Sequence, residues 1–232
     1  MKERGMIFNG EMVRAILDGR KTQTRRIMKP QPGPCPRGGH WWPSNVFKTM
    51  LHVEEEMQNG KGGWGGLVGD ACPFGDVGDR IWVRETWGVV SHAFSDDGLM
   101  IDWVPDRPAT SIHEMPFGNG YYSGYAIYAA DGDFTWGDDD GYEDGRSCWK
   151  PSIHMPRAAS RILLEITDVR VERLRSMSQD DARAEGVIAA SGPMEAGLAS
   201  RELWDSIYGE ESWNANPWVW VIEFKRVEGG AA

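Results

Sequence analysis

Apolar residues recur at helical spacing near the start of the chain and again towards its end. The first set, spaced by three and four residues, consists of Met12, Val13, Ile16 and Leu17. This spacing is typical of one face of an amphipathic helix. Asn9 can cap this helix and Gly19 can end it. Further on, Ser178 with Asp181 three residues later predicts a second helix that runs to Gly186, and a short helix is expected over 200–208.

Strand patterns alternate with these helices. The segment 78–90 (GDRIWVRETWGVV) enters through a Gly-Asp turn and alternates apolar with polar residues, which predicts a strand. A long strand is predicted for RILLEITDVRVERL at 161–174, and a possible one for 121–129. The segment WVWVIEFKRV at 218–227 is rich in Val, Ile and Phe, so it is the strongest strand prediction in the chain.

Two regions lack a regular period. Residues 30–77 are rich in Gly, Pro and Trp, and residues 91–159 contain an acidic run, so both read mainly as long loops. The pattern predicts one α+β domain that carries two large loop-rich insertions. Its core is expected over about 6–29, 78–90, 160–187 and 200–227.

Charge narrows the range of partners. The 232 residues carry a net charge of -10, which argues against a protein that coats duplex DNA with a basic face. Residues 1–29 nevertheless hold eight Lys/Arg against three Asp/Glu, enough to attract a small anionic ligand. Three widely spaced cysteines favour a reducing compartment. Because we find neither a signal-peptide core nor a membrane-spanning apolar run, we expect a cytoplasmic protein without a membrane partner.

The segment DGRKTQTRR at 18–26 carries the candidate chemistry. Lys21 and Thr24 lie three residues apart just after the first predicted helix, where a bend can bring ammonium and hydroxyl together. A threonine hydroxyl becomes a useful nucleophile when a neighbouring base accepts its proton, and a partly desolvated lysine can be that base. The spacing alone favours the alternative, solvated residues in a turn.

The motif GRKTQTRR resembles the G-x-K-x-x-T-x-R signature of ASCH domains, a PUA-like family with a small β-barrel flanked by helices. GDRIWV, LRSMSQDDARAEGV and VWVIEFKRV resemble further family segments in the same order. The chain looks like an enlarged form of the small bacterial ASCH enzymes that hydrolyse N4-acetylcytidine. It is more similar still to ASCH proteins common in phages and prophages. The resemblance covers under half of the chain.

This resemblance implies an amidohydrolase that acts on an N-acylated nucleobase or nucleoside. Carried over by position, Thr24 is the nucleophile, Lys21 activates it, and Glu185 accepts and donates protons. Arg20, Arg25 or Arg26 can stabilise the oxyanion, and the last two are equally suited to hold a phosphate or stack on a base.

Three other residues are candidates for substrate binding. Strand alternation puts Glu85 and Trp87 on one face, where a base can stack on Trp87 while Glu85 accepts from its amine; the alternative is a buried Arg–Glu pair. His154 can line the site because histidine titrates near neutrality, or it can be structural.

Two other functions stay open. One is a binding module for RNA, single-stranded nucleic acid or a modified nucleotide that does not react with its ligand. The other is a ribonuclease. The spacing of Cys35, His40, Cys72 and His154 fits no closed zinc site, so neither metal nor cofactor is expected.

Overall fold

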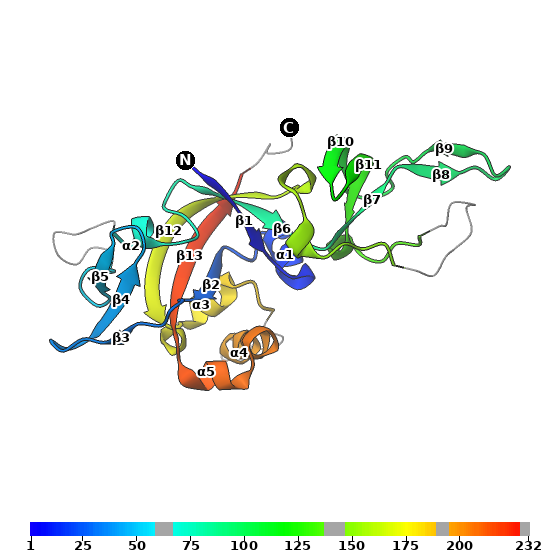
Figure 1. Ribbon diagram of the computed structural model, residues 1–232. Helices are drawn as coiled ribbons and strands as arrows, with labels where there is room; N and C mark the ends of the chain where they lie inside the picture. The colour runs from blue at the N-terminus through cyan, green and yellow to red at the C-terminus, as the bar shows by residue number, and fades with distance from the viewer. Residues whose placement is uncertain (59–66, 137–146, 189–194, 228–232) are drawn as a thin grey trace. The chain divides into compact units, whose positions relative to one another are not determined.

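The computed structural model describes residues 1–58, 67–136, 147–188 and 195–227 (Figure 1). The protein is mostly sheet with few helices, which confirms the predicted α+β class. It divides into two compact units. Unit 1 comprises 1–4, 15–81 and 164–226, and unit 2 comprises 5–14, 82–163 and 227–232. In the described part of the chain, no helix is long and apolar enough to cross a membrane.

The largest sheet has the strand order β1-β6-β12-β13-β2. Its members are β1 (Glu3–Ile7), β6 (Arg80–Arg84), β12 (Leu163–Arg173), β13 (Trp218–Arg226) and β2 (Gln23–Ile27). Strand β13 lies next to the edge strand β2 and pairs antiparallel with both β12 and β2. Because β1 and β2 are the edges, this sheet is open, and none of the sheets formed by the described strands closes on itself. The predicted small β-barrel is therefore not confirmed.

Both faces of β13 are buried, which explains its nearly continuous apolar sequence. Val219 and Val221 lie on one face, in a core cluster with Leu174 and Trp204. Trp220 lies on the other face and packs edge-to-face on Trp42, with ring centroids 5.4 Å apart.

The predicted helix caps are present. Helix α1 (Gly10–Leu17) begins after Asn9, whose Oδ1 accepts a hydrogen bond from the Met12 N–H at 2.8 Å. Helix α3 (Gln179–Ala184) begins with a capping box, because the Ser178 hydroxyl accepts from the Asp181 N–H while the Asp181 carboxylate accepts from the Ser178 N–H. Helix α4 (Glu195–Tyr208) starts earlier than predicted, and α5 (Glu210–Ala215) follows it.

The regions expected to be mainly loops contain a helix and several strands, of which only β11 was predicted, as a possible strand over 121–129. Region 30–77 holds β3 (Gly33–Pro34), β4 (His40–Ser44), β5 (Thr49–His52) and α2 (Leu67–Ala71). Region 91–159 holds β8 (His92–Phe94), β9 (Met100–Asp102), β10 (Thr110–Phe117) and β11 (Gly120–Tyr128). Short 3-10 turns cover Ala129–Asp131, Ser152–His154, Arg157–Ala159 and Leu174–Ser176. A register shift between Ile112 and Met115 interrupts the alternation in β10.

The strand predicted over 78–90 is divided in two. β6 ends at Arg84, and β7 (Trp87–Val90) pairs with β11 in the sheet β10-β11-β7. Glu85 and Thr86 separate the two strands. The single strand was wrong because the chain changes sheets at this point, which the apolar pattern does not record.

Gly186, directly after α3, is a close-approach point. Its φ is +87°, and a Cβ built there would lie 2.7 Å from the Cβ of Lys21 and 2.8 Å from the Cβ of Ala15. Only glycine meets both constraints, because a side chain at this position is strained by its backbone and also collides with its neighbours.

We therefore predict that Gly186→Ala lowers the free energy of unfolding by about 3 kcal/mol, the sum of backbone strain and overpacking. Gly78→Ala is the matched control, because Gly78 has a φ of +84° but no atom within 4 Å of a built Cβ. That variant should lose only about 1 kcal/mol. Urea unfolding measures both, and equal losses would show that close packing at Gly186 contributes nothing.

Candidate functional site

The end of α3 lies against the segment that enters β2. The Thr22 N–H donates to the Ala184 carbonyl at 2.8 Å, and Lys21 and Glu185 form an isolated antiparallel bridge. These backbone contacts bring two residues 164 positions apart into register. The sequence analysis paired the same two residues through the ASCH resemblance.

Lys21, Arg25 and Glu185 form a buried ion cluster. The Lys21 ammonium donates to the Glu185 Oε2 at 2.7 Å and to the Glu185 carbonyl at 2.9 Å. Arg25 donates to the other carboxylate oxygen at 3.1 Å. The Lys21 side chain is fully buried, whereas that of Glu185 keeps 10% of its surface exposed. Glu185 is thus the member of the ion pair that solvent can reach.

Burial lowers the pKa of Lys21 below its ordinary value. Desolvation is the main cause, since the charged ammonium has lost its water. The charge of Glu185 and its hydrogen bond oppose this shift, and the positive charges of Arg26 and Arg25 add to it. A lysine with a lowered pKa releases its proton more readily, so it can act as a base.

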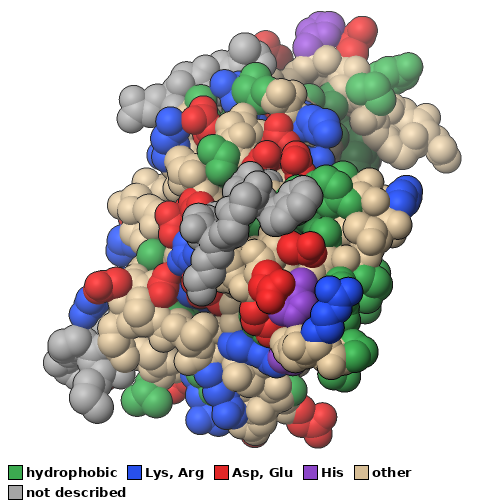
Figure 2. All heavy atoms as spheres, turned by 90° about the vertical axis from the view of Figure 1, so that its left-hand side faces the viewer, with side chains coloured by type: hydrophobic (Ala, Val, Ile, Leu, Met, Phe, Trp, Pro, Cys, Tyr) green, Lys and Arg blue, Asp and Glu red, His purple; other side chains and the backbone are tan. Residues whose placement is uncertain are grey.

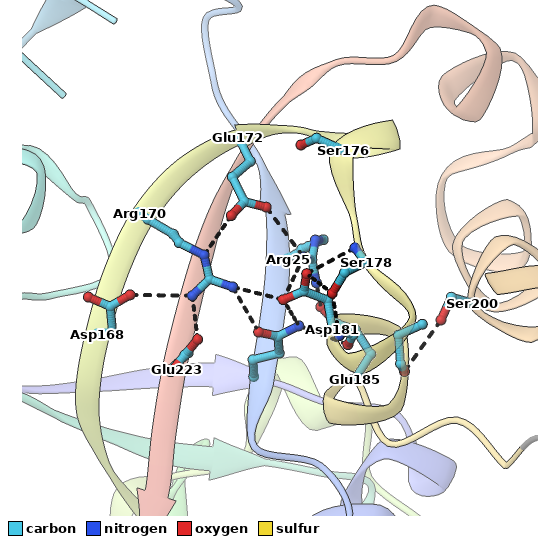
Figure 3. A network of polar contacts seen from close by, with 12 residues as sticks. Arg25, Asp168, Arg170, Glu172, Ser176, Ser178, Asp181, Glu185, Ser200 and Glu223 are labelled. Carbon is cyan, nitrogen blue, oxygen red and sulfur yellow. Dashed lines mark hydrogen bonds and ion pairs between the residues drawn. The ribbon is translucent and has the colours of Figure 1, made fainter. Parts of the chain in front are cut away.

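A wider polar network surrounds this cluster. Figure 3 shows Arg170 of β12 between Asp168, Glu172, Asp181 and Glu223. Asp181 also lies 3.4 Å from Arg25, which connects the network to the buried cluster. Burial alone would raise the pKa of Asp181, but hydrogen bonds from Ser178 and Gln23 and the Arg25 charge hold it well below its usual range.

This network was not predicted, although the sequence contains a signal for it. Asp168, Arg170 and Glu172 occupy alternate positions of β12, with Val169 and Val171 between them. Alternation places the three charges on one face of the sheet, and three charges on one face of a strand predict either solvent or a polar partner there. The partner is α3.

Thr24 does not join the cluster. It is buried on β2, directly opposite Ile222 of β13. Successive strand residues point to opposite faces, so Thr24 lies on the face away from Arg25. Both hydrogen bonds described for the Lys21 ammonium go to Glu185. The expected Lys21–Thr24 hydrogen bond is therefore not among the contacts of this structure, and the role of Thr24 as nucleophile stays a prediction.

The neighbouring arginines have different environments. Arg20 is partly exposed and donates to the Gly186 carbonyl at 2.6 Å and to Asp18 at 2.8 Å, so it fastens the turn after α3. Arg26 shares the Thr24 face of β2, opposite Trp220, and lines a cavity at the edge of the sheet. The predicted arginine set is thus divided between the ion cluster, the turn and the cavity.

The other predicted binding residues belong to unit 2. Glu85 is buried, and Arg161 donates to both of its carboxylate oxygens at 3.0 Å. Burial raises the pKa of Glu85, while the Arg161 hydrogen bonds and charge oppose that change. The alternative of a buried Arg–Glu pair is therefore the arrangement found.

Trp87 is fully buried in a core cluster with Ile112, Met115 and Tyr128. A fully buried ring offers no face to a base, so the predicted stacking role does not fit this structure. His154 is exposed at the end of a 3-10 turn.

Comparisons with known proteins give the chain no relative. No protein-family model, curated protein or solved structure matches it. The ASCH resemblance therefore rests on the motif residues quoted above and stays a prediction.

We predict that Glu185→Gln lowers the free energy of unfolding at neutral pH by roughly 3 kcal/mol, because the buried ammonium of Lys21 loses its counter-charge. Without that charge the pKa of Lys21 falls further. The unfolded chain then binds more protons than the folded one at alkaline pH, so the stability of the variant rises with pH. Wild-type Lys21, whose pKa is lowered less, releases its proton at higher pH. The deficit relative to wild type should therefore shrink as the pH is raised from the titration of Lys21 in the variant to its titration in wild type.

Urea unfolding of both proteins over a wide pH range, from mildly acidic to alkaline, checks the prediction. The exposed ion pair Lys225–Glu165 supplies the control, since Glu165→Gln should change stability little at any of these pH values. A deficit that is constant with pH would mean that Lys21 is not the titrating partner.

Proposed function

We propose that this chain is an amidohydrolase with a PUA-like, ASCH-type core that removes an acyl group from an N-acylated nucleobase or nucleoside. The observation that carries the proposal is the fully buried Lys21, whose pKa is lowered and whose ammonium lies 2.7 Å from Glu185. Perturbed, paired titratable groups of this kind are frequent at catalytic sites, although ion-pair networks also produce them. The substrate class is taken from the ASCH resemblance.

The pair can manage the protons of amide hydrolysis. Neutral Lys21 accepts the proton of a hydroxyl nucleophile, whose oxygen attacks the acyl carbon. The C–N bond then breaks, and the exocyclic amine leaves with a proton returned by the pair. Arg25 provides a positive charge beside Glu185 throughout this exchange.

The motif and the geometry favour different nucleophiles. The resemblance assigns the Thr24 hydroxyl, which must then approach Lys21 when substrate binds. A water molecule activated by the Lys21–Glu185 pair needs no movement of Thr24, and it would meet the pair at Glu185, the member that solvent reaches. In the first case an acyl-threonine intermediate forms and is hydrolysed by water, and in the second the acyl group is released as the acid directly.

A binding module is the second candidate, and one observation favours it. Thr24 lies on the face of β2 away from the ion cluster, so the three motif residues do not assemble into one reactive group here.

A ribonuclease is the weaker alternative. Figure 2 shows acidic and basic side chains mixed over one face of the molecule without a continuous basic field, which suits a small ligand better than a long duplex.

We predict that the wild-type protein releases the acyl group from N4-acetylcytidine or a related N-acylated nucleoside, as followed by mass spectrometry. Lys21→Met should reduce the rate by about 10³-fold, because general-base catalysis is lost. The rate of wild type should rise with pH through the lowered pKa of Lys21, since only the neutral amine accepts a proton. In Glu185→Gln this rise should move to lower pH, a shift that a purely structural role of Glu185 would not produce.

Thr24→Val and Thr24→Ser identify the nucleophile. If the hydroxyl attacks, the valine variant is inactive and the serine variant retains activity; if water attacks, the valine variant retains most of the rate. Absence of product from folded wild type across a panel of acylated cytosine and adenine nucleosides would refute the enzyme and favour the binding module.

A further inference from the structure

A cavity of about 360 Å³ lies at the edge of the main sheet in unit 1. Its volume is within the range of small-ligand sites. It is lined by Arg26, Ile27, Lys29, Pro73, Phe74, Tyr208 and Trp220. Two of these residues are cations, three are aromatic, and none of the described lining residues is acidic. A cavity with this composition suits an anionic ligand that carries a flat ring.

The aromatic wall is held in place by its neighbours. Trp220 is buried on β13 and packs at 84° against the ring of Trp42. Tyr208, at the end of α4, packs on Trp204 with ring centroids 4.4 Å apart. Trp220 is only 1% exposed, so it forms the floor of the cavity, and a planar ligand contacts the half-buried rings of Phe74 and Tyr208. Because Tyr208 is held by Trp204, its ring loses little conformational entropy when such a ligand binds.

The cations belong to the edge strand β2 and the residues that follow it. Arg26 stands opposite Trp220 in the β2–β13 register, so guanidinium and indole share one face of the sheet. Lys29 follows shortly afterwards and is exposed. A guanidinium offers a phosphate two parallel donors, and an ammonium adds a flexible point charge.

We propose that this cavity binds a nucleoside 5′-monophosphate, with the base against Phe74 and Tyr208 and the phosphate between Arg26 and Lys29. The inference deepens the amidohydrolase proposed above and rests on it for the identity of the ligand as substrate. It names the substrate as a nucleotide in place of a free nucleoside.

Thr24 is two residues from Arg26 on the same strand face, about 7 Å away. Arg26 and Trp220 line the cavity from the face of β2 that carries Thr24, whereas Ile27 and Tyr208 line it from the opposite face, so the cavity opens at the edge between the two faces.

Binding is tested separately from turnover, with cytidine 5′-monophosphate, cytidine and inorganic phosphate as the three probes. Calorimetric titration of wild type at low salt should show that the monophosphate binds at least 30-fold more tightly than cytidine or phosphate. The difference should fall as salt is raised, since it is carried by charge. Arg26→Gln and Lys29→Ala should each reduce monophosphate affinity by 10-fold or more and leave the weak cytidine binding nearly unchanged.

Lys225→Ala is the matched control, because it removes one exposed positive charge of the same unit that does not line the cavity. It should keep the preference for the monophosphate. Thermal unfolding of every variant identifies any that is not folded, and Lys29→Ala, an exposed position, preserves the test if Arg26→Gln fails to fold.

Four results would overturn the inference. They are equal affinity for cytidine and its monophosphate, equal affinity for inorganic phosphate and the monophosphate, an unchanged preference in Lys29→Ala, and an equal loss of affinity in Lys225→Ala. The two proposals fail separately. Tight monophosphate binding without hydrolysis of any acylated compound refutes the enzyme alone, whereas hydrolysis of N4-acetylcytidine without preference for a monophosphate refutes the nucleotide site alone.

Discussion

The buried ammonium of Lys21 is the constraint on which the arrangement of unit 1 depends. A lone charge of this kind is expensive to bury, so the chain must supply a carboxylate at the same depth. Glu185 is 164 positions away and reaches Lys21 only if the end of α3 docks beside the entry to β2. Gly186 allows that approach, because its α-hydrogen occupies the place where a Cβ would meet the Cβ of Lys21. The ion pair therefore depends on the glycine.

The same docking creates the polar layer between α3 and the sheet. Once α3 covers this face of β12 and β13, Arg170 and its acidic partners lose much of their water, and each needs a partner in the layer. The Ser178–Asp181 capping box begins α3 at the position from which Asp181 reaches Arg170. Helix capping and the ion network thus use the same carboxylate, which makes the orientation of α3 strongly dependent on charge.

The sequence predicted where helices and strands lie better than it predicted which sheet face each residue occupies. The caps Asn9 and Ser178 and the strands at β12 and β13 follow from local chemistry, which is why they were found. β11 matches the possible strand predicted over 121–129. The other strands of 30–77 and 91–159 were missed because they are short or contain Gly or Pro, and because each gains its pairing from a neighbour that a local pattern does not contain. The change of sheet at Glu85 was missed for the same reason.

The candidate site shows the same division. The motif spacing identified Lys21, and the resemblance supplied Glu185, but the bend expected to unite Lys21 with Thr24 depends on where β2 begins. Residues 23–27 are extended, and period-two alternation then sends Thr24 and Arg26 to the face opposite Arg25. The motif alone does not say which face of the sheet each residue occupies, whereas the strand places every residue on one face or the other.

This separation defines what catalysis by the chain would require. A lysine acts as a base only in its neutral form, yet a carboxylate 2.7 Å away stabilises its charged form. Desolvation outweighs that stabilisation, since the pKa of Lys21 is lowered despite Glu185. Whether Lys21 is charged or neutral depends on how much water the Lys21–Glu185 pair retains, and Glu185 is the exposed member of the pair. A ligand that displaces this water would strengthen both the desolvation of the amine and its attraction to the carboxylate, so substrate binding itself must decide where the proton resides.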